Sequence, residues 1–303
     1  MDNKITPPSH YGIAEQPPAA DTSFVKRRFL DIAYADLSPS QKLDIYLPDE
    51  GSGPFPVILA IHGGAFMGCD KADMQVLPML AGLRRGYAVV SINYRLSWQA
   101  KFPALVQDAK AAVRWIRANA GRYFLEAKKV AAWGGSAGGY LATMLGLSSG
   151  VDKLEDLRLG NPHQSCDLQA VVSWYGPTNF LNMDALLAES GLLPPEGFRH
   201  SEANSPESLL LGARITTIPD QVRIANPETY LRQTAPPFFI QHGRADAVVP
   251  FQHSLQLAEK LKQSIGKESL QLELLEGAAH ADPRFETPEN VNKVLDFLDR
   301  FLM

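Results

Sequence analysis

A serine is flanked by small residues at the point where an apolar run ends and a helix-forming stretch begins. Residues 134–138 read Gly-Gly-Ser-Ala-Gly and match the pattern G-x-S-x-G. They follow the apolar run 130–133 and precede the stretch 140–147, which predicts a strand, a sharp turn and a helix with Ser136 at the apex. Only small residues fit beside such a turn, because larger side chains would collide with the neighbouring strand and helix. A hydroxyl held out on a strained turn is well placed to act as a nucleophile.

Apolar runs alternate with helical segments along most of the chain. Continuous β-branched runs predict buried parallel strands, and alternating apolar and polar residues near the start predict two half-exposed antiparallel strands. The predicted strands are 24–35, 43–47, 57–61, 87–92, 130–133, 170–174, 237–241 and 270–275. The main predicted helices are 102–120, 140–147, 252–265 and one that starts near 287. We therefore expect an α/β fold with a mostly parallel eight-stranded sheet and helices on both faces.

The organisation of the chain predicts one catalytic domain, residues 23–303. Residues 1–22 contain two proline pairs and show no periodicity, which predicts a flexible N-terminal arm. The stretch of about residues 179–234 separates two predicted strands and is too long for a simple crossover. We expect it to form a lid or a substrate-pocket insertion; the alternative is a few extra helices packed on the outside.

Two polar residues that follow strand ends complete a set with Ser136. Asp246 comes after the predicted strand 237–241, and His280 comes after the predicted strand 270–275. Because the carboxyl ends of parallel strands meet at one edge of a sheet, we expect these side chains to lie together. Ser136 would be the nucleophile, His280 the base and Asp246 the acid that orients the imidazole. Asp282 is a rival acid, but it lies only two residues beyond His280 and would struggle to reach its Nδ1.

The loop after the predicted strand 57–61 reads His-Gly-Gly-Ala-Phe, residues 62–66. Its glycines allow the backbone to approach a substrate closely. The N–H of Ala137 and the N–H groups of this loop are expected to stabilise the negative oxygen of a tetrahedral intermediate. We interpret His62 as a residue that holds the loop, and His200, His242 and His253 as structural.

Composition excludes several other classes of function. The net charge of −4 and the pI of about 6.0 give no electrostatic reason to expect nucleic acid or an anionic membrane as a partner. No apolar run reaches the roughly 18 residues of a membrane span. The two cysteines, Cys69 and Cys166, lack zinc-site spacing and are expected to be free thiols. We expect neither a metal nor an organic cofactor, and the oligomeric state, including a homo-oligomer, stays open.

The first twenty residues lack the apolar core of a secretory signal. This indicates a cytoplasmic protein, although a secreted protein whose signal had been removed would look the same.

Several motifs together carry a family resemblance. They are residues 62–66, Asn-Tyr-Arg-Leu at 93–96, Trp-Gly-Gly-Ser-Ala-Gly-Gly at 133–139 and His-Gly-Arg-Ala-Asp at 242–246. The chain resembles, over about residues 40–300, an α/β-hydrolase esterase of the branch that includes bifunctional feruloyl and acetyl-xylan esterases, near the hormone-sensitive-lipase-like esterases.

This resemblance implies an α/β-hydrolase fold with Ser136, Asp246 and His280 as the catalytic triad. It also implies that Gly64, Ala65 and Ala137 supply the oxyanion hole. Ala65 stands where the lipase-like relatives often carry a third glycine. Its N–H is retained, and its methyl group is expected to narrow the site.

We therefore expect a serine carboxylesterase that hydrolyses short-chain or aromatic acyl esters through an acyl-enzyme intermediate. Small-molecule esters and acetyl or feruloyl groups on plant polysaccharides are the candidate substrates. Phe66, Trp98 and Phe180 are predicted to line an apolar substrate pocket. The alternatives are an arylformamidase-like amide hydrolase and a non-catalytic, hydrolase-like receptor for a small ligand.

Overall fold

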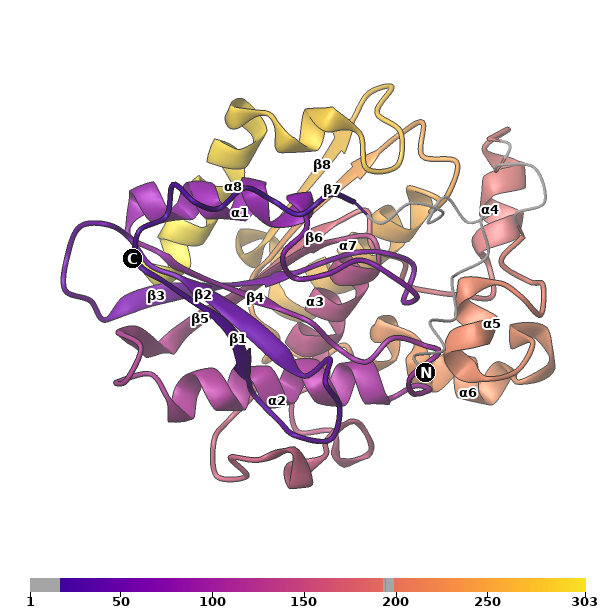
Figure 1. Cartoon of the computed structure of the whole chain (residues 1–303). Helices are drawn as coiled ribbons and strands as arrows, with labels where there is room; N and C mark the ends of the chain where they lie inside the picture. The colour runs from indigo at the N-terminus through magenta and orange to yellow at the C-terminus, as the bar shows by residue number, and fades with distance from the viewer. Residues whose placement is uncertain (1–16, 193, 195–198) are drawn as a thin grey trace.

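Eight strands make up one sheet in the described part of the chain (Figure 1). The computed structural model describes residues 17–192, 194 and 199–303. The strands are β1 Arg28–Ala33, β2 Lys42–Tyr46, β3 Phe55–Ile61, β4 Ala88–Ile92, β5 Leu125–Gly135, β6 Ala170–Trp174, β7 Phe238–Gly243 and β8 Leu270–Leu275. Their spatial order is β1-β2-β4-β3-β5-β6-β7-β8. The pairs β1–β2 and β2–β4 are antiparallel, and all later pairs are parallel.

Helices cover both faces of this sheet. The α-helices are α1 Leu77–Leu80, α2 Ala104–Ala118, α3 Ala137–Leu147, α4 Met183–Glu189, α5 Pro206–Leu211, α6 Pro219–Ala225, α7 Gln252–Ile265 and α8 Pro288–Leu302. Short 3-10 helices are Met74–Val76, Ala81–Arg85, Asp152–Leu154, Leu157–Leu159, Ile215–Thr217, Pro227–Tyr230, Lys267–Ser269 and Pro283–Glu286. The side chains of α2, α3 and α7 belong to one buried cluster, and those of α1 and α8 to another on the opposite face (Figure 1). The predicted α/β-hydrolase fold class is confirmed.

Burial on both faces of the sheet explains why the sequences of the central strands are apolar without interruption. All seven residues of β3 are buried. Val57, Leu59 and Ile61 belong to the cluster that includes α2 and α3, whereas Ile58 and Ala60 belong to the cluster that includes α1 and α8. Successive side chains of a strand point to opposite faces, so a strand covered on both sides must be apolar at every position.

The strand boundaries differ from the prediction where polar residues continue a strand. β5 begins at Leu125, whereas the apolar run begins only at Val130. Residues 126–129 are only partly covered, but Leu125 still pairs with Phe55 of β3. An apolar run therefore marks the buried part of a strand and misses its solvated end.

The residues that precede β1 contact the loop after β3. Residues 1–16 of the predicted arm lie outside the described residues. Within the remainder, the N–H of Ala20 donates to the carbonyl of Ala72 (2.8 Å), and the N–H of Met74 donates to the carbonyl of Pro18 (3.1 Å). Ala19 and Asp73 form an isolated antiparallel bridge. Residues 18–20 therefore run alongside residues 72–74, the segment that leads into α1.

The long stretch between β6 and β7 contains α4, α5 and α6. These three helices gather at one end of the molecule (Figure 1). Its residues 193 and 195–198 lie outside the described residues. Asn179 and Asn226 hydrogen-bond each other across the stretch, Nδ2 of Asn226 to Oδ1 of Asn179 (3.3 Å), and so bring its two halves together.

Gly138 allows the N-terminus of α3 to touch the end of β3. A Cβ atom at this position would lie 2.1 Å from the carbonyl oxygen of Ile61 and 2.8 Å from that of His62. Both obstacles are backbone atoms at the end of β3 and directly after it, so neither can move aside cheaply.

We expect Gly138→Ala to lower the free energy of unfolding by at least about 2 kcal/mol, because the added methyl separates α3 from the sheet. Gly121→Ala is the matched control, since a Cβ there would meet no atom of the described structure within 4 Å. The control should change stability by less than about 0.5 kcal/mol. Urea denaturation measures both, and equal midpoints for Gly138→Ala and the wild type would show this interpretation to be wrong.

His253 attaches α7 to the start of the long stretch after β6. Its Nδ1 accepts a hydrogen bond from the N–H of Thr178 (3.1 Å), and its Nε2 donates to Oδ1 of Asn182 (2.7 Å). Both ring nitrogens are thus used by a neutral imidazole. Burial lowers the pKa of His253 to about 3, and the positive charges of neighbouring histidines act in the same direction.

This shift makes stability depend on pH in a defined direction. Between about pH 6.5 and about pH 3 the unfolded chain binds a proton at His253 that the folded chain does not bind. The free energy of unfolding should therefore fall by about 1.4 kcal/mol for each pH unit below about 6.5. In His253→Gln this component should be absent, whereas a variant of the exposed His163, His163→Gln, should follow the wild type. Denaturation curves between about pH 7 and about pH 4.5 test this; a wild-type slope retained in His253→Gln contradicts it.

Candidate active site

Ser136 occupies a strained turn between β5 and α3. Its φ of 55° and ψ of −121° lie in a region that residues with a Cβ rarely adopt. Neighbouring glycines make the turn possible, because a Cβ on Gly134 would lie 2.4 Å from the carbonyl carbon of Gly138. The N–H of Ser136 donates to the carbonyl of Trp174 in β6 (2.9 Å), which anchors the turn to the sheet. The predicted strand, turn and helix are all present.

The three residues predicted to act together do meet. Nε2 of His280 lies 3.0 Å from Oγ of Ser136, and Nδ1 of His280 lies 2.7 Å from Oδ2 of Asp246. Asp246 follows β7 and is fully buried, while the His280 side chain in the loop after β8 keeps 18% of its surface exposed. The edge of the Tyr175 ring packs against the imidazole at 4.9 Å between centroids. A nucleophile, a base and an orienting acid require spacing of this kind.

Asp246 is held from several sides. Its Oδ1 accepts hydrogen bonds from the N–H groups of Val248 and Val249, each at 2.8 Å. Its Oδ2 is shared by His280 and by Nε2 of His242 at 3.2 Å. Burial acts to raise the pKa of Asp246, but the charge and hydrogen bonds of the two histidines outweigh it and hold the pKa well below its usual range. Asp246 is therefore an ionised carboxylate in contact with the imidazole of His280.

Asp282, the rival acid, has a different role. Its Oδ2 accepts from the N–H of Ala279 (3.2 Å), and its Oδ1 pairs with Nε of Arg284 (2.8 Å). These bonds to backbone and to Arg284 brace the loop that carries His280. The geometry favours Asp246 as the partner of the imidazole.

The three predicted oxyanion-hole residues line the same cavity as Ser136. Ala137 is the first residue of α3, so its N–H has no intrahelical partner. In the described structure the N–H groups of Gly64 and Ala65 form no hydrogen bond with protein atoms, whereas that of Gly63 donates to Oε1 of Gln75 (2.8 Å). Gly64 and Ala65 have φ values of 102° and 51°. The loop thus keeps two N–H groups available beside the serine.

The side chain of His62 holds this loop in place. Its Nδ1 donates to the carbonyl of Gly63 (2.8 Å), and its ring stacks on Tyr94 at 4.5 Å between centroids. The Tyr94 hydroxyl donates to the carbonyl of His62 (2.9 Å). These contacts agree with the interpretation of His62 as a residue that holds the loop.

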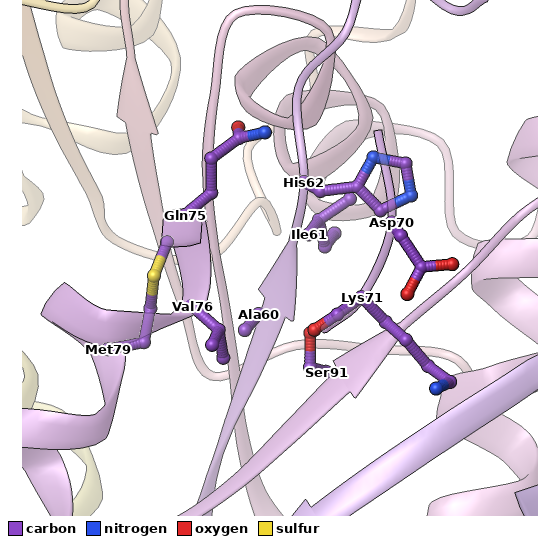
Figure 2. A pocket seen from close by; sticks show the side chains of 9 residues that line it. All are labelled: Ala60, Ile61, His62, Asp70, Lys71, Gln75, Val76, Met79 and Ser91. Carbon is purple, nitrogen blue, oxygen red and sulfur yellow. The ribbon is translucent and has the colours of Figure 1, made fainter. Parts of the chain in front are cut away.

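A small pocket lies behind the same loop. Figure 2 shows His62 beside Asp70 on one side of it and Gln75 on the other. Its volume of about 10 Å³ leaves room for no more than about one water molecule. The loop therefore rests on protein atoms, which keeps its N–H groups in place.

The cavity lined by Ser136 and His280, the catalytic cavity, has a volume of about 410 Å³. Phe66 lines it, but Trp98 and Phe180 do not, so the prediction of a pocket wall from these two residues is corrected. Phe180 is buried beneath the wall, against the rings of Phe66 (6.0 Å) and Tyr140 (5.4 Å). The Trp98 indole N–H donates to the carbonyl of Met67 (3.2 Å), and 42% of the residue is exposed. Sequence position placed both near the site, but their side chains point elsewhere.

Sequence reasoning missed the part of the wall that the long stretch after β6 supplies. His200, Pro206 and Glu207 line the cavity together with Val248 and Val249. No strand end or recognisable motif marks the first three residues in the sequence. Their position became apparent only from the folded chain.

Other predicted features concern metals, thiols and membranes. No cluster of three or more His, Cys, Asp or Glu side chains in the described ranges is arranged to hold a metal ion. Cys69 and Cys166 are not joined by a disulfide. None of the helices in the described part of the chain has the length and apolar character needed to cross a membrane.

Known proteins resemble this chain in sequence. The probable carboxylic ester hydrolase LipM of Mycobacterium tuberculosis is 30% identical over 244 residues, which are 77% of this chain and 51% of LipM. Esterase LipC of the same organism is 28% identical over 85% of this chain and 60% of its own length. The chain thus spans about half to three fifths of the length of these curated relatives.

Solved structures resemble it in fold, and a family profile matches most of it. A bifunctional GH43-CE protein of Bacteroides eggerthii has a TM-score of 0.80 and 35% identity, covering 91% of this chain and 38% of that protein. A truncated carbohydrate esterase from gut microbiota has a TM-score of 0.82 and 28% identity, covering 93% and 99%. The BD-FAE family profile matches residues 43–261. The chain therefore belongs to the BD-FAE family and has the α/β-hydrolase fold.

Proposed function

We propose that this protein is a serine carboxylesterase with Ser136, His280 and Asp246 as its catalytic triad. The observation that carries the proposal is the continuous hydrogen-bonded chain from Oγ of Ser136 through the imidazole of His280 to the buried carboxylate of Asp246. A protein that only bound a ligand would not need this chain. Names of relatives and structural neighbours that contain the words esterase or carboxylic ester hydrolase support the same conclusion.

The first half of the reaction forms an acyl-enzyme. Oγ of Ser136 attacks the ester carbon while Nε2 of His280 takes the hydroxyl proton, and Asp246 stabilises the imidazolium. The carbonyl oxygen becomes an oxyanion that the N–H groups of Gly64, Ala65 and Ala137 are placed to stabilise. The bond to the alcohol oxygen then breaks, and His280 gives its proton to the leaving alcohol.

The second half repeats these steps with water. His280 removes a proton from the water as its oxygen bonds to the acyl carbon, and the same N–H groups stabilise the second oxyanion. The bond to Oγ breaks, Ser136 regains its proton from His280, and the carboxylic acid leaves. The residues named here suffice for this chemistry.

The substrate class we propose is an ester of a short-chain or aromatic acid, including acyl groups on saccharides. A cavity of about 410 Å³ beside Ser136 accommodates an acetyl or a single-ring acyl group. Phe66, Pro177 and Val249 give it apolar walls. Two structural neighbours are described as a carbohydrate esterase and as a bifunctional GH43-CE protein, which supports a saccharide on the alcohol side.

We also propose that the stretch of about residues 179–234 is a pocket-forming insertion in the single catalytic domain. Its residues His200, Pro206 and Glu207 form part of the cavity wall. Helices that only packed on the outside of the domain would not contribute these side chains.

The mechanism predicts which substitutions abolish turnover. Ser136→Ala should lower kcat/KM for an activated acetate ester by at least about 10,000-fold, because no nucleophile remains. Asp246→Asn should lower kcat by about 10,000-fold, because the amide favours the wrong tautomer of His280. The measurements are steady-state kinetics with para-nitrophenyl acetate and thermal unfolding of each variant.

Asp282→Asn is the matched control for the acid. It removes a carboxylate two residues from His280 and should cost less than about tenfold in kcat/KM. Equal losses in the variants of Asp246 and Asp282 would refute the assignment of the acid. Turnover in Ser136→Ala equal to that of the wild type would refute the proposed function. A panel of acetyl, butyryl, octanoyl and feruloyl esters together with aryl amides then distinguishes ester from amide hydrolysis.

A further inference from the structure

A buried ion pair forms part of the wall of the catalytic cavity. Oε1 of Glu207, in α5, lies 3.1 Å from Nδ1 of His200, and both residues are almost completely buried, with Glu207 3% exposed. Nε2 of His200 donates to the carbonyl of Val248 (2.8 Å), two residues after Asp246. The pair therefore joins the insertion to the loop that holds the triad carboxylate.

The second oxygen of Glu207 is not used by the protein. In the described structure Oε2 of Glu207 is buried and has no hydrogen-bond partner. A buried acceptor without a partner destabilises the folded protein, and more so when it is charged. Such groups are rare in native proteins, and those that line a site are candidates for contact with a ligand.

Three other carboxylates with little or no exposure are fully paired. Oε1 of Glu155 pairs with Lys110 (3.0 Å) and Oε2 with Arg114 (2.7 Å). Oδ1 of Asp108 accepts from Gln41, and its Oδ2 accepts from Arg95. Asp246 likewise uses both of its oxygens. Within the described residues, Oε2 of Glu207 is the only buried carboxylate oxygen that lacks a hydrogen-bond partner, and Glu207 is one of the residues that line the catalytic cavity.

The pair is held in place before any substrate binds. Both carboxylate oxygens of Asp184 accept backbone N–H groups, those of His200 (2.8 Å) and Ser201 (2.9 Å). Oγ of Ser205 accepts from the N–H of Ser208 (3.1 Å) and caps the helix that carries Glu207. A preorganised acceptor binds a substrate group with little ordering cost.

The charge balance of the pair indicates the class of the missing donor. Burial acts to lower the pKa of His200, but the charge of Glu207 and the hydrogen bonds to Glu207 and Val248 outweigh it and raise the pKa. A protonated His200 matches the charge of Glu207 across the 3.1 Å contact, so a second cation is not required. A neutral donor such as a hydroxyl group satisfies the open oxygen.

We propose that Oε2 of Glu207 accepts a hydrogen bond from a hydroxyl group of the bound ester substrate. This inference rests on the proposed esterase function, because it places the hydroxyl in the same cavity as Ser136. The hydroxyl belongs either to a sugar on the alcohol side or to a phenol on the acyl side. Glu207 would then select hydroxyl-bearing esters over simple alkyl esters.

Wild-type enzyme tests the inference through its substrates. One series is a monoacetylated methyl xyloside and its analogues in which one free hydroxyl at a time is replaced by hydrogen. The other is methyl ferulate against methyl meta-methoxycinnamate, which lacks the phenolic hydroxyl. Removal of the hydroxyl that donates to Oε2 of Glu207 should lower kcat/KM by about tenfold or more. The series that responds identifies the side of the ester that carries the hydroxyl.

Glu207→Gln links this response to the residue. In this variant the same hydroxyl removal should cost about twofold or less in kcat/KM. Glu202→Gln is the matched control, because Glu202 lies in the same insertion but is exposed and pairs with Arg214. It should keep the wild-type response to hydroxyl removal.

The outcomes separate this inference from the proposed function. Hydrolysis of para-nitrophenyl acetate by the wild type but not by Ser136→Ala supports the esterase whatever Glu207 does. With that activity present, the inference is overturned if no hydroxyl removal costs more than about twofold, or if neither the xyloside nor the ferulate is hydrolysed. A Glu207→Gln variant that keeps the full wild-type response overturns it as well. If Glu207→Gln does not fold, the wild-type series decides alone. If the wild type hydrolyses none of these esters, the proposed function is refuted instead.

Discussion

The candidate site depends on a backbone contact between the start of α3 and the end of β3. Gly138 touches the carbonyl oxygen of Ile61 so closely that no side chain fits between them. This contact places the N-terminus of α3 directly beside the loop that begins at His62. Ser136 and the N–H groups of Gly64 and Ala65 consequently line one cavity. Without the close approach, Ser136 would lie farther from these N–H groups.

Buried polar groups then position the remaining parts of the site. Asp246 is held by two backbone N–H groups and by His242, so the orientation of His280 is set by a rigid carboxylate. His200 connects the same loop to the insertion through the carbonyl of Val248. The chemistry and the cavity wall are thus coupled through residues 246–249. The proposed substrate contact of Glu207 lies at the far end of this connection.

Several features could be predicted because their physical causes are local. A strand covered on both faces must be apolar throughout, so β3, β4, β5 and β6 were recognisable from short runs of sequence. The turn at Ser136 needs small neighbours, and residues after parallel strands gather at one sheet edge, which brought Asp246 and His280 into the prediction. The residues that form the cavity wall were harder to predict. Phe180 and Trp98 are near the site in sequence order, but one packs into the core and the other reaches the surface.

The amino-acid sequence by itself determined the α/β class of the fold, most of the strands, and the set of Ser136, Asp246 and His280 that comes together in the structure. Periodicity, glycine placement and strand-end position report on forces that act within a few residues or along one sheet edge. Only the tertiary structure decided which side chains line the cavity, that His242 shares the carboxylate of Asp246, and that Glu207 pairs with His200. These contacts join segments with no common periodic pattern, so their geometry depends on how the insertion packs against the completed sheet.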